Sequence, residues 1–346
     1  MCIITGLEEK LKLKLFMTEK GVALMIVLWI MMLLIVMVFA FSVMVRTEVF
    51  STIVFKEQME NKYLAEAGLQ RAMLEILYRN ANKSMVSNND ETDVCSVDGT
   101  FYQGKMEEGR YHFAITDESG KININLLTDA SGILLNNLLV NMGVEKNQAD
   151  TIVDSILDWK DGDDLHRMHG AENDYYMSLT HPYKSKDANF TSLEELLLVQ
   201  GVTRDILYGT EERPGLIEYL TVYTSTAQIN INAAKPEVLK AIPSISEETV
   251  QMIINYRTSY NAQKDESGLL SILSAENSGT IASYITTADS NMYLVEVIGY
   301  RQEKNGGYRL KAVVAAEGIN RCRIVSYQSP AHVVMPKDDA VKKHLQ

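Results

Sequence analysis

The stretch "TEKGVALMIVLWIMM", Thr18 to Met32, opens a long apolar run directly after a Lys-Gly pair. The run extends from Gly21 to Val45, 25 residues in which Ser42 is the only polar one. At about 1.5 Å per residue in a helix, this length exceeds the roughly 30 Å hydrocarbon core of a bilayer. It is also longer than the apolar core of a signal peptide, about 7–15 residues. The run therefore predicts a membrane-spanning helix.

Helical periodicity continues beyond the apolar run. In "RTEVFSTIVFKEQMENKYLAEAGLQRAMLEILYRN", apolar residues recur at helical spacing and charged residues occupy the other faces. No proline occurs before residue 182, and Gly68 is the only glycine in this segment. We predict one helix from about Val22 to Arg79, its first half in lipid and its second half in water.

Basic residues lie on one side of the apolar run. Lys10, Lys12, Lys14 and Lys20 precede it. Positive residues stay on the cytoplasmic side of a membrane, so the bulk of the chain is expected to face outward. The net charge of −12 argues against a nucleic-acid binder and is compatible with a cation site or a basic partner protein.

The three cysteines exclude a metal cage of thiolates, because three are too few and no CxxC occurs. Cys2 precedes the apolar run, whereas Cys95 and Cys322 follow it. Outside the cytoplasm these two could form a disulfide, and two separate thiols are equally compatible with the sequence.

Two β-rich segments flank a largely helical middle. Residues 99–127, "GTFYQGKMEEGRYHFAITDESGKININLL", alternate in polarity, and Ile122 and Ile124 are expected to begin a short strand. Residues 292–330 indicate three strands separated by turns, the first turn at Asn305-Gly306-Gly307. This layout predicts an α+β protein in which a β domain is interrupted by a helical insertion.

The helical middle contains an internal echo, since "KININLLTD" at 121–129 resembles "QININAAKP" at 228–236. Residues 134–159 and 238–257 each follow one copy and indicate helix-hairpin-helix units, with a shorter third unit at 193–209. Such units can bind DNA phosphates through glycine-rich hairpins. The first hairpin offers only Gly143, the third only Gly201, and the second, at 243–246, has none. We interpret them as packing units; salt-dependent DNA binding would be the signature of a DNA-uptake protein instead.

Acidic residues crowd "DWKDGDDLHRMHGAENDYY", residues 158–176. Carboxylates packed this closely repel one another unless a cation or solvent relieves them, and Ca²⁺ takes about 6–8 oxygen ligands. Asp161, Asp163 and Glu172 match positions 1, 3 and 12 of an EF-hand loop. Leu165 at position 5 and His166 at position 6 break the match, so the segment is not an EF-hand but offers similar ligands.

A zinc enzyme is the alternative for the same segment. His166, His169 and Glu172 have the spacing H-x2-H-x2-E. A zinc site needs its histidines on one helix face, and Gly170 with its charged neighbours indicates a loop. Metal analysis would separate a membrane-anchored, metal-dependent hydrolase from a calcium protein. No other arrangement in the sequence indicates catalysis.

The N-terminus resembles class III prepilins in its basic leader ending at Lys20-Gly21, its helix opening Val22-Ala23-Leu24, and the later "KYLAEAGLQRAM". The resemblance implies that prepilin peptidase cuts after Gly21 and methylates Val22. Most pilins have Glu at the fifth mature position, where this chain has Ile26. That departure is typical of the general secretion pathway protein K family, the large minor pseudopilins of type II secretion. An ordinary single-pass anchor is the alternative.

The family resemblance implies a pilin fold interrupted by an extra α-domain. Its expected boundaries are 1–21 for the prepilin leader, 22–45 for the transmembrane half of the helix, 46–129 for the first part of the pilin-like domain, 130–288 for the helical insertion, 289–330 for the remaining β part, and 331–346 for a C-terminal tail.

The resemblance also implies calcium. "DWxDxD", "GAExDYY", Pro182-Tyr183 and Ala188-Asn189 follow the pattern of this family, which is described as binding calcium at two sites in its α-domain. The ligands carried onto this chain are Asp161, Asp163, Glu172, Asp174 and the amide of Asn189. Which of them would hold which ion stays open.

The function implied is structural rather than enzymatic. A protein of this family is inserted in the inner membrane, with its bulk in the periplasm, and assembles with other minor pseudopilins at the tip of a short pseudopilus. Prepilin peptidase and the inner-membrane assembly platform would be further partners. The sequence leaves open the exported proteins, service to a type IV pilus instead, and whether Met1 or Met17 is the start.

Overall fold

The computed structural model describes residues 4–82, 95–258, 281–302, 307–318, 320–333 and 341–343. The chain divides into two units, Met1–Glu60 and Asn61–Gln346. The helix α1, Ile4–Ala81, contributes to both. The predicted long helix is confirmed, but it begins at Ile4 rather than near Val22. The residues that precede the apolar run contain no proline and many strong helix formers such as Leu, Lys and Glu, which explains the earlier start.

The first unit consists of α1 up to Glu60, and it presents its apolar side chains outward. The helical segment Gly21–Ala81 contains a window of mean hydropathy 3.2 with none of its area buried by protein. Within the described ranges, it is the one helix whose length and composition would span a membrane. Large exposed side chains such as Trp29 and Phe39, about 70% accessible, need cover from lipid or from neighbouring helices.

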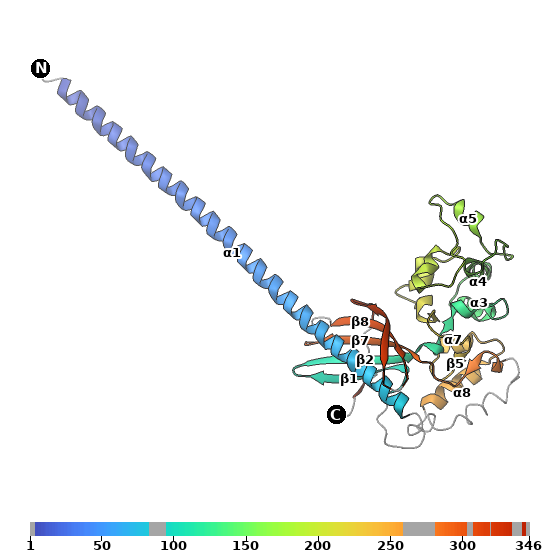
Figure 1. The fold of residues 1–346 in the computed structure, drawn as a ribbon. Helices are drawn as coiled ribbons and strands as arrows, with labels where there is room; N and C mark the ends of the chain where they lie inside the picture. The colour runs from blue at the N-terminus through green and yellow to red at the C-terminus, as the bar shows by residue number, and fades with distance from the viewer. Residues whose placement is uncertain are drawn as a thin grey trace. The chain divides into compact units, whose positions relative to one another are not determined.

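The second unit is built on a six-stranded sheet in the order β10-β1-β2-β7-β8-β9 (Figure 1). Its strands are β1 Asp98–Met106, β2 Gly109–Asp117, β7 Met292–Tyr300, β8 Tyr308–Ala316, β9 Cys322–Gln328 and β10 Val341–Lys343. All neighbours are antiparallel except β10, which pairs in parallel with β1. The segment predicted as a tail over 331–346 thus contains a short edge strand.

The C-terminal part of α1 packs on this sheet. Ala65, Leu69, Ala72 and Ile76, spaced at one helix face, are buried in the same apolar cluster as the inward side chains of β2, β7 and β8. The helix lies so close to the sheet that a Cβ at Gly299 would collide with the α1 backbone. Cys95 is buried in this cluster, and Cys322 packs against it from a partly buried position.

The helical insertion leaves the sheet at the end of β2 and returns at the start of β7 (Figure 1). It contains its own apolar core. Its elements are η1 Glu118–Gly120, β3 Ile122–Asn123, η2 Ile124–Leu126, α3 Gly132–Asn141, α4 Lys146–Lys160, α5 Asn173–Met177, η3 Leu193–Leu198, α6 Arg204–Tyr208, η4 Leu216–Glu218, β4 Leu220–Thr221, β5 Ile229–Asn230, α7 Pro236–Lys240, α8 Glu247–Thr258 and β6 Ile285–Thr286.

The strand predicted at Ile122 and Ile124 is shorter than expected. It ends at Asn123, whose side chain accepts a hydrogen bond from the backbone N–H of Asn125 and turns the chain into η2. A side-chain oxygen used in this way offers the backbone an alternative to continued strand pairing.

The three predicted hairpins are present as α3–α4, η3–α6 and α7–α8. Each turn contains a residue with positive φ: Gly143 at 86°, Gly201 at 84° and Ser244 at 65°. The second unit of the sequence echo therefore makes the same left-handed turn without a glycine, which is a strained backbone for serine. The common turn geometry shows that the hairpins are versions of one structural unit.

Candidate metal centre

The acidic segment forms a loop between α4 and α5, as predicted. Helix α4 ends at Lys160, and the backbone N–H of Asp161 closes its last turn on Leu157 O at 3.2 Å. The loop then folds back on the helix, and Gly170 lies directly against the carboxylate of Asp158. A side chain at position 170 would occupy the space of that carboxylate, so glycine is required there.

The loop brings together three carboxylates that the sequence singled out. Asp161, Asp163 and Glu172 each offer an oxygen, and these oxygens lie within 4.8 Å of one another. Among the residues that the structure describes, no other group of three such side chains is this close. Two residues come from the start of the loop and one from its end, so the group closes the loop on itself.

Glu172 is the residue that points most clearly to a ligand. Its side chain is buried, with 1% of the residue accessible, and neither carboxylate oxygen has a hydrogen-bond partner. Burial, together with the negative charges of Asp158 and Asp161, raises the pKa of Glu172 to about 7. A buried carboxylate without a partner is strongly unfavourable when charged.

Asp161 also has an unpaired acceptor, because its Oδ1 is buried and has no hydrogen-bond partner. Three neighbouring carboxylates, two of which have buried oxygens without a partner, are the donor set of a hard divalent cation. Ca²⁺ accepts such ligands in flexible geometry. The residues present therefore fit a bound calcium ion.

Aromatic side chains support the loop from below. The ring of Trp159, in the last turn of α4, packs edge-on to Tyr176 with 5.0 Å between centroids, and Tyr183 and Phe190 pack against the same indole. Trp159, Tyr176 and Phe190 are buried. This cluster ties α4, α5 and the segment after α5 together beneath the carboxylates.

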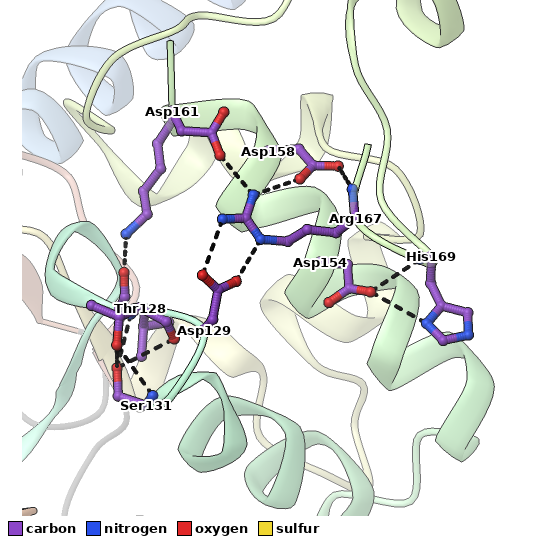
Figure 2. A network of polar contacts seen from close by, with 10 residues as sticks. Thr128, Asp129, Ser131, Asp154, Asp158, Asp161, Arg167 and His169 are labelled. Atoms are coloured by element: carbon purple, nitrogen blue, oxygen red, sulfur yellow. Dashed lines mark hydrogen bonds and ion pairs between the residues drawn. The ribbon is translucent and has the colours of Figure 1, made fainter. Parts of the chain in front are cut away.

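Arg167 is a member of the site that the sequence did not single out. Its guanidinium contacts Asp158, Asp161 and Asp129, as Figure 2 shows. Burial raises the pKa of Asp158, and the hydrogen bonds from Arg167 offset part of that rise. The position of Arg167 among several carboxylates in the sequence could have indicated its part in the site. Nothing in the sequence around Asp129, which lies before α3, indicated such a part.

Two predicted ligands lie outside the group. Asp174 is exposed, and its Oδ1 lies 2.9 Å from Nε2 of His166 and accepts the backbone N–H of Tyr175. Asn189 is exposed in the loop before η3. Their role as calcium ligands stays a prediction. The predicted processing residues, Gly21 and Val22, lie in the exposed part of α1.

The geometry does not favour the zinc enzyme. His169 pairs with Asp154 through Nδ1 at 3.2 Å, while His166 pairs with Asp174. Both rings are about 40% accessible, and neither joins Glu172 in a ligand group within the described part of the chain. The spacing H-x2-H-x2-E thus places its three side chains in different surroundings.

Comparisons with known proteins agree on one family. A family model described as "Type II secretion system (T2SS), protein K" matches residues 120–210, which include α3, α4 and the acidic loop. "Putative type II secretion system protein K" of Escherichia coli (strain K12) is 26% identical over 226 residues, 62% of this chain and 66% of the relative. "Type II secretion system protein K" of Pectobacterium carotovorum is 30% identical over 113 residues, 32% of this chain and 34% of the relative. The matched segments thus span less than two thirds of these two relatives.

A solved structure shares the fold. The GspK-GspI-GspJ complex of enterotoxigenic E. coli contains a chain that aligns with a TM-score of 0.52 and 15% identity, over 82% of this chain and all of that one. The likeness extends over sheet and insertion alike, and it supports the fold class predicted from the sequence.

Proposed function

We propose that the chain belongs to the type II secretion system protein K family and acts as a minor pseudopilin of such a system. The observation that carries the proposal is the combination of one apolar N-terminal helix with a sheet interrupted by a helical insertion that the family model matches. This role is structural and supports protein export. It requires no catalysis.

The proposed partners are other minor pseudopilins. The solved structure with the same fold is named as a complex of GspK with GspI and GspJ. By analogy, this chain would assemble with such subunits at the pseudopilus tip. Ile26 cannot make the charged contact that a Glu would make with a neighbouring N-terminus, and the insertion is large for a repeated position in a shaft.

The proposed location is the inner membrane, with the second unit in the periplasm. The apolar run from Gly21 to Val45 would span the bilayer, and the lysines before it would stay in the cytoplasm. Prepilin peptidase would cut after Gly21 and methylate Val22 before the assembly platform takes up the subunit.

We propose a structural calcium ion held by Asp161, Asp163 and Glu172. Calcium would satisfy the buried oxygens of Glu172 and offset the mutual repulsion of the three carboxylates. Asp174 and Asn189 would bind a second ion, or they would become further ligands of the first ion after a local rearrangement. Binding to the folded chain alone would stabilise the insertion.

The first test is the intact mass and N-terminal peptide of the protein from native membranes. We expect the mature chain to begin at Val22 and to carry one added methyl group. A retained leader, in a strain with working prepilin peptidase, would contradict the pseudopilin assignment and favour a permanent anchor. Affinity purification of the same protein should recover other pseudopilins.

A further inference from the structure

Arg167 holds together three carboxylates that come from different parts of the insertion (Figure 2). Its Nη1 lies 2.6 Å from Asp158 Oδ1 and 2.6 Å from Asp161 Oδ2. Its Nε lies 2.7 Å from Asp129 Oδ1. One guanidinium therefore connects the segment before α3, the last turn of α4 and the start of the acidic loop.

The contact with Asp161 uses only one of its two oxygens. Oδ2 accepts from Arg167, whereas Oδ1 is buried and has no partner. The Asp161 carboxylate also belongs to the group with Asp163 and Glu172. The guanidinium thereby restricts the rotation of the Asp161 carboxylate and leaves its other oxygen available as a ligand. Planar, charge-assisted hydrogen bonds of this kind restrict geometry more strongly than a flexible ammonium does.

Arg167 is itself held in place from the other side. Its backbone N–H donates to Asp158 Oδ2 at 3.2 Å, and Asp158 is fully buried. The positive charge is thus shared with Asp158 and Asp129, two carboxylates outside the ligand group. The negative charges of Asp158 and Asp129 largely balance the repulsion between Arg167 and an incoming cation. The orienting effect of Arg167 on the Asp161 carboxylate remains.

We infer that Arg167 is a positioning residue for the divalent cation at Asp161, Asp163 and Glu172, and that it preorganises the Asp161 ligand without touching the ion. The inference rests on the calcium site of the proposed function. It predicts that loss of Arg167 weakens cation binding. Simple electrostatics predicts the opposite, because removing a positive charge beside a cation site would tighten binding.

The decisive variant is the double substitution Arg167→Gln with Asp158→Asn, which removes one charge of each sign and leaves the local net charge unchanged. Calcium binding by the full chain in detergent would be measured by titration calorimetry after chelation. We expect affinity to fall by about 10-fold or more, as for loss of other groups that orient metal ligands. Equal or tighter binding would overturn the inference.

Control variants test whether a loss of calcium affinity is specific to Arg167 or follows from any change of charge or folding in the insertion. Arg213→Gln removes an arginine of the same insertion that donates to Met142 O, and it should leave calcium affinity unchanged. Asp129→Asn removes the exposed side of the network and should weaken binding by about 2–3-fold at most, since exposed ion pairs are weak. If the double variant does not fold, Arg167→Lys, which keeps the charge but not the planar fork, should weaken binding in the same direction.

A second readout excludes a merely structural role. Loss of a structural residue lowers the melting temperature equally with and without calcium, whereas loss of a positioning residue reduces the rise in melting temperature that calcium produces. An undiminished rise in the double variant would refute the inference. If the wild-type chain binds no calcium, the proposed metal site fails; if it binds and the double variant binds equally, only the role of Arg167 fails.

Discussion

Gly170 is held against α4 so closely that the Asp158 carboxylate fills the space a Cβ would need. We expect Gly170→Ala to displace the loop, to lower stability by about 1–3 kcal/mol as other overpacked substitutions do, and to weaken calcium binding. Thermal unfolding and calcium titration would measure both effects. Gly162, in the same loop, has no atom within 4 Å of an added Cβ, so Gly162→Ala is the matched control and should change little.

Glu172 is buried and carries two unpartnered oxygens, so its charge is unfavourable until a cation binds. In a chelator we therefore expect the wild-type melting temperature to fall, since an ion at 100 times its Kd stabilises by about 2.7 kcal/mol. Glu172→Gln should abolish the dependence on calcium and raise the melting temperature measured in chelator.

Asp164→Asn is the control for this variant, because Asp164 is an exposed carboxylate of the same loop outside the ligand group. It should retain the calcium-dependent shift. A shift that survives in Glu172→Gln would place the ion elsewhere.

At these residues, part of the site could be predicted from the sequence. Asp161, Asp163 and Glu172 lie within twelve positions, and the crowding of like charges is visible in the sequence itself. Asp129 could not be found, because it joins Arg167 from 38 positions away and depends on how α3 and α4 pack. The pairing of His166 with Asp174 was likewise invisible, since any of several nearby carboxylates could have taken that partner.

Among the elements, the two copies of the sequence echo behave as one repeated unit. β3 and β5 each pair in parallel with a two-residue strand. At the end of the second helix in each copy, a basic side chain returns to the connector, where Lys160 donates to Leu127 O and Arg257 donates to Ala234 O. These two carbonyls occupy matching positions in "KININLLTD" and "QININAAKP". The sequence predicted the echo, but only the structure shows the shared contact.

The connection between sheet and insertion depends on Asp117, the last residue of β2. Its carboxylate accepts hydrogen bonds from Ser119, where the insertion begins, and from Ser290, where it ends. Burial raises the pKa of Asp117 above its usual value of 3.8, and the hydrogen bonds with the two serines offset part of that rise.

The pH dependence of stability follows from this direction. A raised folded-state pKa means that the folded chain binds the proton more tightly than the unfolded chain. Stability should therefore decrease as the pH rises from about 3.8 through the raised pKa, relative to Asp117→Asn, which cannot titrate. Melting temperatures of the two proteins across this acid range would test it; parallel curves would contradict the assignment.

For the whole second unit, the separate apolar cores of sheet and insertion indicate two modules. Asp117 and Tyr293 are opposite each other in the antiparallel pair of β2 and β7, so a two-residue turn can join these strands. We expect a chain in which residues 118–292 are replaced by such a turn to retain the sheet and its recovery with other pseudopilins. It should lose calcium binding. Circular dichroism, affinity purification and calorimetry would measure the three properties.

The architecture at this scale was largely predictable. Alternating polarity marked the strands, and the helical spacing between them marked the insertion. The parallel pairing of β10 with β1 was not predictable, because it joins residues about 240 positions apart and is set by where the returning chain lies.

The position of the insertion also determines how the sheet would respond to mechanical load. Both connectors enter at the same end of β2 and β7, which are the two central strands. Tension between insertion and sheet would pull these neighbours lengthwise and together, so the hydrogen bonds to β1 and β8 on either side would bear it in parallel. Shear of that kind is the most resistant way to load a sheet, whereas a connector on the edge strand β9 would let the sheet peel one bond at a time.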